Sequence, residues 1–134
     1  MMTHTPLTVF LRRVLLFDAA TCLLTGIVLL TAAGTVEQLL EIPAALSRAL
    51  SAVLLIFGAA VAWVGTRRAL LRPAVWAILS LNALWAVESV LALALGWLEP
   101  NSLGRAFIIV QAAAVAVIAE LQFIGLRRAG KLAV

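Results

Sequence analysis

The sequence holds one cysteine and one histidine in 134 residues, and this scarcity excludes several kinds of site. Cys22 alone cannot form an internal disulfide or a multi-cysteine metal site. His4 lies in the N-terminal tail, so a haem held by intramembrane histidines, a histidine-based metal site and a Ser-His or Cys-His dyad are excluded. The sequence also lacks a phosphate loop and a nucleotide fingerprint. We therefore expect no metal, no cofactor and no enzymatic activity.

Charged side chains are also scarce. They make up 12% of the chain, whereas 65% of the residues are hydrophobic. A soluble domain usually has about 25% charged and about 45–50% apolar residues. A water-soluble fold of this size would have too little polar surface to cover itself, so we predict an all-α membrane protein. The basic residues cluster at the ends of apolar runs, which favours contact with the bilayer and its anionic lipid headgroups over nucleic-acid binding.

Four apolar segments fill most of the chain, and each is long enough for a transmembrane helix of about 20 residues. Thr35 and Gln38 have the spacing of a capping box, which predicts a short interfacial helix after the first segment. Pro43 and Pro73 fit the first turns of the helices that follow them. We predict a four-helix bundle forming one integral membrane domain over residues 1–134. Its helices are expected at about residues 8–33, 44–66, 73–97 and 103–126, with the interfacial helix at about residues 36–42.

The basic residues are unevenly distributed among the junctions between these segments. Arg48 and Arg105 share two junctions with the acids Glu37, Glu41 and Glu99. The other basic residues flank the remaining ends: Arg12, Arg13, Arg67, Arg68, Arg72, Arg127, Arg128 and Lys131. Cytoplasmic loops carry the excess of lysine and arginine. We therefore predict that both termini and the central loop lie in the cytoplasm.

A weak internal repeat raises the hypothesis of a duplication. Residues 46–49 resemble residues 103–106, and residues 65–69 resemble residues 125–129. Each pair of segments flanks the second helix of a predicted hairpin. Both hairpins start inside, so a duplication would be parallel, with an axis along the membrane normal. The alternative is that similar topology signals recur at similar places.

A few polar residues fall inside the predicted helices, where such side chains normally face the bundle interior or water. At 100° per residue, Asn82, Trp85, Glu88 and Ser89 lie within one arc of about 120° on the third helix. Gln111 on the fourth helix lies at a similar depth, and we predict that it is the partner of Glu88. This combination of amide, carboxyl and indole suits a pocket for a small amphiphile or a lipid headgroup. Hydrogen bonding between helices without any ligand is the alternative.

Two further acids are expected near the cytoplasmic helix ends. Asp18 shares a stripe with Cys22 and two threonines that should face other helices. Glu120 aligns with Arg127, seven residues further on. We predict intramembrane charge pairing for both acids, with Arg68 or Arg127 as the partner of Asp18. A ligand or proton role is the alternative for Asp18.

Three stretches carry a resemblance to a known group of proteins: the Asp-containing first helix, residues 82–85 and residues 119–122. Through them most of the chain resembles small four-helix inner-membrane proteins of bacteria. The resemblance implies a multi-pass protein of the bacterial inner membrane and carries no established activity. Small multidrug-resistance transporters fit less well, because they carry a glutamate in the first helix. The Gly/Asn/Phe signatures of double-barrelled fluoride channels are also missing.

Two functional hypotheses follow. In the first, the protein binds or transports a small amphiphile or lipid through the polar and aromatic site on the third helix. In the second, it is a non-catalytic accessory or structural subunit of a larger membrane complex, or a homo-oligomer. Ser51, Gly58 and Gly65 recur every seven residues on the second helix, where we expect them to allow close helix packing. An accessory subunit would instead expose such a small-residue face for docking. A formed cavity beside Trp85 would favour the first hypothesis.

Overall fold

The computed structural model describes residues 5–132, and these residues form five helices. His4 therefore lies outside the described part of the chain. The helices are α1 (Val9–Thr31), α2 (Ala33–Leu40), α3 (Ala44–Gly65), α4 (Arg72–Ala94) and α5 (Ser102–Leu132). All but α2 are long and apolar enough to cross a membrane. The prediction of an all-helical chain with four membrane-length helices is confirmed.

Several helix ends differ from the predicted ones. The short helix α2 begins at Ala33 and is capped by Ala32, so the predicted capping box of Thr35 and Gln38 was wrong. Helix α4 ends at Ala94, and Gly96 then adopts a positive φ of 74°, which glycine tolerates and which ends the helix early. Helix α5 continues to Leu132 because alanine, leucine, arginine and lysine are all good helix formers.

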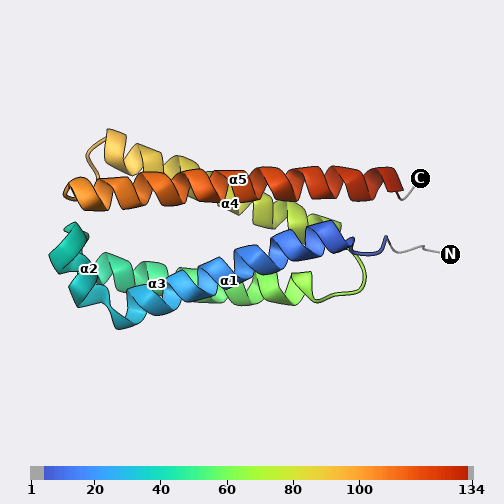
Figure 1. Ribbon diagram of the computed structural model, residues 1–134, viewed down its shortest axis with the longest axis horizontal. Helices are drawn as coiled ribbons and strands as arrows, with labels where there is room; N and C mark the ends of the chain where they lie inside the picture. Colours follow the sequence, from blue (N-terminus) through green and yellow to red (C-terminus); the bar gives the residue numbers. More distant parts are fainter. Residues whose placement is uncertain (1–4, 133–134) are drawn as a thin grey trace.

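The four long helices form two pairs, α1 with α3 and α4 with α5 (Figure 1). Glycines allow the first pair to pack closely. A Cβ added at Gly58 would lie 2.9 Å from Cγ of Leu23, and one added at Gly65 would lie 3.0 Å from Cδ2 of Leu16. The small residues of α3 thus pack against α1 inside the protein, as expected for residues that allow close helix packing, and they do not form the exposed docking face that an accessory subunit would need.

The two pairs meet firmly at the end of the molecule where both termini lie (Figure 1). Leu11, Leu15 and Leu126 are fully buried there. The Arg12 guanidinium donates to the Gly65 carbonyl oxygen at 2.7 Å and to the Arg67 carbonyl oxygen at 3.0 Å, which caps the end of α3. The basic N-terminal segment, the α3–α4 connection and the last turns of α5 are therefore gathered at one end.

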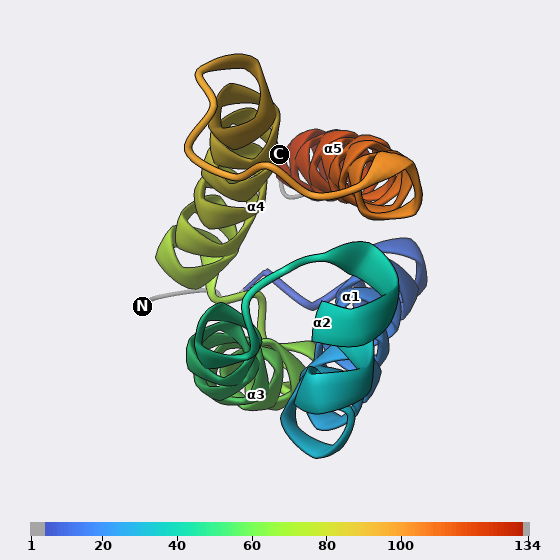
Figure 2. The same cartoon turned by 90° about the vertical axis from the view of Figure 1, so that its left-hand side faces the viewer.

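At the opposite end, α2 and the α4–α5 connection bridge the two pairs (Figure 2). The Asn101 backbone N–H donates to the Leu40 carbonyl oxygen at 3.2 Å, and the Asn101 side chain donates to the Leu39 carbonyl oxygen at 2.8 Å. Ile42, Leu93 and Ile108 form a small apolar cluster beside these bonds. The pairs are thus joined at both ends.

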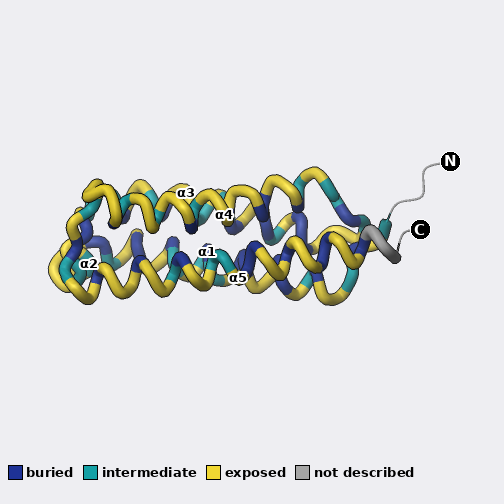
Figure 3. Tube along the Cα trace, turned by 90° about the horizontal axis from the view of Figure 1, so that it is seen from above, coloured by how far each residue is buried: buried dark blue, intermediate teal, exposed yellow. Residues whose placement is uncertain are grey.

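The outer surface of the helices is largely apolar. Figure 3 shows buried positions along the inner sides of the helices and exposed positions along the outer sides. The exposed positions include large hydrophobic side chains such as Ile56, Val110 and Phe17. Contiguous apolar surface of this extent marks contact with a membrane or a partner, and the four membrane-length helices favour a multi-pass membrane protein.

Candidate functional site

A cavity of about 320 Å³ lies between the two helix pairs. On α1 its wall runs from Phe17 to Leu29, a length of about 18 Å at a rise of 1.5 Å per residue. The cavity is therefore elongated along the helices. Most of its wall is apolar and includes Leu50 and Leu54 of α3 and Ile118 of α5.

The cavity lies between the joined ends of the two pairs and reaches the surface at its side. Ile42 and Ile108, from the cluster that bridges the pairs, line the α2 end. Phe17 of α1 and Phe107 of α5 also line the cavity, yet 61% and 43% of their respective surfaces are exposed. The cavity is therefore not fully enclosed by the bundle.

Three of the predicted ligand-binding residues meet in the wall of this cavity. The Trp85 indole N–H donates to Oε1 of Gln111 at 2.9 Å, and Nε2 of Gln111 donates to Oγ of Ser89 at 3.0 Å. The Ser89 hydroxyl in turn donates to the Trp85 carbonyl oxygen at 2.8 Å. All three side chains line the cavity. This chain of hydrogen bonds fixes the orientation of the indole in the wall.

The other two predicted ligand-binding residues lie elsewhere. Asn82 is buried but belongs to a neighbouring cluster and does not line the cavity. Glu88 is exposed and lies outside the cavity wall. The predicted Glu88–Gln111 bond was wrong, because Gln111 bonds Trp85 and Ser89 instead. Glu88 lies at the edge of the polar arc, about 120° from the buried Asn82 at 100° per residue, and so faces outward.

A buried polar network joins α1, α4 and α5 at the end of the cavity nearer the chain termini. Oδ2 of Asp18 accepts N–H bonds from Asn82 at 2.8 Å and from Gln122 at 2.7 Å. The Asn82 amide also donates to Oε1 of Gln122 at 3.0 Å. On the other side, the Cys22 thiol lies 3.5 Å from Oδ1 of Asp18. Asp18 is 2% exposed and Gln122 is fully buried.

The predicted pairing of Asp18 with an arginine was wrong, because its partners are the two amides. The cause is depth. Helix α1 starts at Val9, so Asp18 lies nine residues, or about 13 Å, from the helix start. The basic side chains stay nearer the end, where Arg12 caps α3. The expectation that the stripe of Asp18 and Cys22 faces other helices is confirmed.

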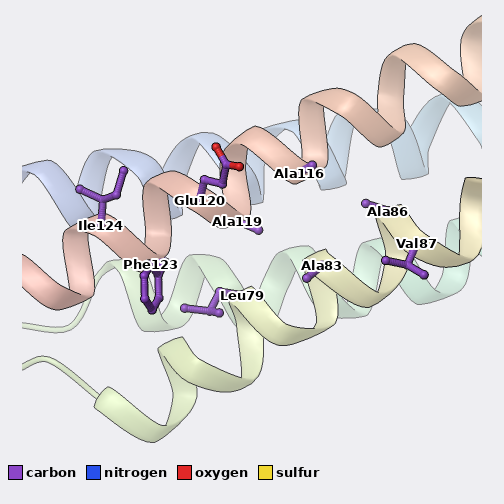
Figure 4. A pocket seen from close by; sticks show the side chains of 9 residues that line it. All are labelled: Leu79, Ala83, Ala86, Val87, Ala116, Ala119, Glu120, Phe123 and Ile124. Atoms are coloured by element: carbon purple, nitrogen blue, oxygen red, sulfur yellow. The ribbon is translucent and has the colours of Figure 1, made fainter.

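Glu120 is exposed beside a second, outer groove on the surface of α4 and α5 (Figure 4). This groove of about 530 Å³ has small residues along its floor: Ala83, Ala86, Ala116 and Ala119. Figure 4 shows Phe123 directed toward α4, whereas the Glu120 carboxylate points away from it. The Arg127 guanidinium lies over the Phe123 ring, 5.6 Å from its centre. The predicted pairing of Glu120 with this arginine is therefore not what the structure contains.

One residue of the site, Ser47, was missed in the sequence. The Ser47 hydroxyl lines the cavity and is buried, yet it has no hydrogen-bond partner among residues 5–132. Such orphaned buried groups are uncommon and call for an explanation. Nothing in the sequence around Ser47 marks it. The spacing of Gln122 from Gln111 places both on one face of α5, but spacing alone does not show that the partners of Gln122 are Asp18 and Asn82.

The donor groups around the cavity do not suit a metal ion. Within the described part of the chain, no three His, Cys, Asp or Glu side chains lie close enough together to hold one. The cavity instead offers an apolar wall, one indole, four hydroxyl groups, one amide and one carboxyl group. Comparisons of the chain with protein-family models, with curated proteins and with solved structures find no significant match.

Proposed function

We propose that the protein binds a small amphiphile or lipid in the cavity between the α1–α3 and α4–α5 pairs. The cavity itself is the observation that carries this proposal. Its volume of about 320 Å³ falls within the range of roughly 300–1,000 Å³ for small-molecule pockets, which are mostly apolar with a few placed polar groups. Trp85, Ser89 and Gln111 supply such groups. A ligand polar atom, or a water carried with the ligand, would also partner the Ser47 hydroxyl.

The side opening favours a ligand that comes from the bilayer. Phe17 and Phe107 line the cavity and are also exposed on the outer surface, where lipid would contact them. An amphiphile dissolved in the bilayer could reach the cavity there without crossing either end of the bundle. Binding is the function that this geometry supports; transport would also require the cavity to open alternately at its two joined ends.

The proposal includes a location and an orientation. The protein resides in a bacterial inner membrane with both termini in the cytoplasm. The gathering of the termini and the basic α3–α4 connection at one end supports this orientation, because lysine and arginine are retained on the cytoplasmic side. The same basic end would attract anionic lipid headgroups. The parallel duplication of a two-helix hairpin remains a hypothesis.

Cysteine labelling tests the orientation. In a Cys22→Ser background, cysteines at the exposed positions Gln38 and Ser102 should react with an impermeant thiol reagent in intact cells. A cysteine at the exposed position Thr66 should react only after permeabilisation. Labelling of Thr66→Cys together with Ser102→Cys in intact cells would contradict a single orientation and would favour insertion in both directions.

Trp85 fluorescence tests the binding function. Trp63, Trp76 and Trp97 are exposed, so they should first be replaced by phenylalanine to leave Trp85 as the reporter. A single-chain amphiphile titrated into the protein in maltoside micelles should shift the Trp85 emission saturably, because a ligand in the cavity changes the polarity beside the indole.

A pair of matched variants shows whether the response comes from the cavity. Val115 lines the cavity, whereas Val117 is exposed two residues away on the same helix. Val115→Phe should weaken binding by about tenfold or more, equivalent to about 1.4 kcal/mol, by filling the cavity. Val117→Phe should leave binding unchanged. A response that does not saturate, or that both variants alter equally, would exclude the cavity as the binding site.

The alternative function is that of a non-catalytic accessory subunit, and the outer groove on α4 and α5 favours it. Its four alanines would allow a partner helix to approach closely. Under this alternative, Ala116→Leu should prevent co-purification of a membrane partner, while Val115→Phe should not. Loss of amphiphile binding in Val115→Phe with no effect of Ala116→Leu on any partner would favour the cavity.

A further inference from the structure

We propose that the ligand of the cavity is a cationic amphiphile, an apolar chain with a protonated amine that pairs with Asp18. This inference rests on the proposed binding function and adds the chemical class of the ligand. It depends on the charge of the wall, on the direction in which the two oxygens of Asp18 face, and on the absence of a counter-charge in the network that holds this carboxyl group.

The wall of the cavity carries one charged side chain. Among the described residues that form it, Asp18 is acidic, and none is lysine, arginine or histidine. An anionic headgroup inside the cavity would therefore meet a carboxylate and no cation, which costs free energy because like charges repel strongly where water is excluded. The other membrane-embedded acids, Glu88 and Glu120, are exposed and lie outside this wall.

The two oxygens of the Asp18 carboxyl group have different surroundings. Oδ2 accepts both amide N–H bonds, from Asn82 and Gln122, and neither amide lines the cavity. Among residues 5–132, the hydrogen-bond partner of Oδ1 is the Cys22 thiol alone, at 3.5 Å, and Cys22 does line the cavity. The amides thus hold the carboxyl group from the side away from the cavity. Oδ1 keeps acceptor capacity on the side of Cys22, where a ligand N–H group can reach it.

The partners of Asp18 within the protein leave its charge uncompensated. When it is ionised, a carboxyl group only accepts hydrogen bonds, as Asp18 does here from both amides. Both donors are neutral amides, and a buried carboxylate without a cation is costly. Intramembrane acids of this kind usually pair with another charge or mark a functional site. An ammonium group at Oδ1 supplies the missing charge, while its chain extends along Leu50, Leu54 and Ile118.

The test compares two probes that share one chain, decylamine and decanol, in the protein whose Trp85 is the sole tryptophan. An alkylammonium group, like that of lysine, is protonated at pH 7. In the wild-type site the amine should bind at least about tenfold more tightly than the alcohol. Asp18→Asn keeps an acceptor oxygen for both amides but removes the charge, and should bring the ratio of the two affinities close to one.

Glu88→Gln is the matched control, because it removes one carboxylate from a membrane-length helix outside the cavity. Glu88→Gln should leave the ratio of amine to alcohol affinity unchanged. An equal fall of this ratio in Asp18→Asn and Glu88→Gln would overturn the inference, because it would show a general attraction of the amine to the protein. A ratio of amine to alcohol affinity near one in the wild-type site would also overturn the inference. In that case saturable binding of both probes would leave the proposed function standing. Saturable binding of neither probe would overturn both.

Discussion

A Gln122→Leu variant is expected to lose about 3 kcal/mol of unfolding free energy, measured by denaturant titration in detergent. Gln122 is fully buried and donates to Asp18 at 2.7 Å while accepting from Asn82 at 3.0 Å. The leucine would leave a buried carboxylate with one donor in place of two. Removing a hydrogen-bond partner of a buried group costs about 1–3 kcal/mol and more where the group is charged, and the remaining bond from Asn82 limits that cost.

Gln111→Leu is the matched control on the same helix. It removes bonds to Trp85 and Ser89, which are neutral. Hydrogen bonds between membrane helices average about 0.6 kcal/mol, so this variant should lose only about 1 kcal/mol. A loss in Gln122→Leu no larger than that in Gln111→Leu would show that the Asp18 network adds no more than ordinary contacts between helices.

A second large effect is expected at Gly104, near the start of α5. A Cβ there would overlap the Leu40 carbonyl oxygen and would lie 2.7 Å from Cβ of Pro100. The clash with Leu40 is with backbone, which cannot rotate away. Gly104→Ala should therefore force α2 and α5 apart and cost about 2 kcal/mol of unfolding free energy, since overpacking typically costs about 1–3 kcal/mol.

Gly34→Ala is the control, because the same glycine-to-alanine change is expected to raise stability at this position. Gly34 lies in α2 with nothing within 4 Å of its added Cβ. Alanine is favoured over glycine in a helix by about 0.5–1 kcal/mol, so this variant should be more stable than the parent chain. Stabilisation in both variants would show that α2 and α5 are not in the close contact that joins this end of the bundle.

The helices could be predicted from the sequence because their signal is local. Apolar length locates the four long helices to within a few residues, apart from the extended end of α5. The ends were less predictable. The positive φ of Gly96 depends on how the chain turns there, and α2 starts earlier than predicted without any side-chain cap.

The site was only partly predictable because helical phase gives a face and not a partner. It correctly grouped Trp85 with Ser89 and directed the Asp18 stripe inward. Helical phase could not distinguish an arginine from an amide as the partner of Asp18, because the partner depends on which residues of α4 and α5 lie at the same height along the bundle as Asp18. Ser47 shows the same limit, because helical phase does not reveal that its buried hydroxyl has no partner among residues 5–132.

The two substitutions with the largest expected effects lie at opposite ends of the cavity, near the places where the helix pairs are joined. The Asp18 network lies at the end of the cavity nearer the termini, and the contact of Gly104 with Leu40 supports the bridge at the α2 end. An open space between two joined helix pairs is the feature on which the proposed function depends.

The most direct measurement is a crystal structure grown from a lipidic mesophase with a decylamine brominated at the end of its chain. Anomalous scattering locates the bromine independently of how the ligand is built. We expect a bromine peak beside Leu54 and Leu50, with the amine nitrogen within hydrogen-bond distance of Oδ1 of Asp18. Bromine peaks confined to the outer surface, with the α1–α3 and α4–α5 pairs in contact and no space beside Trp85, would contradict a ligand-binding cavity.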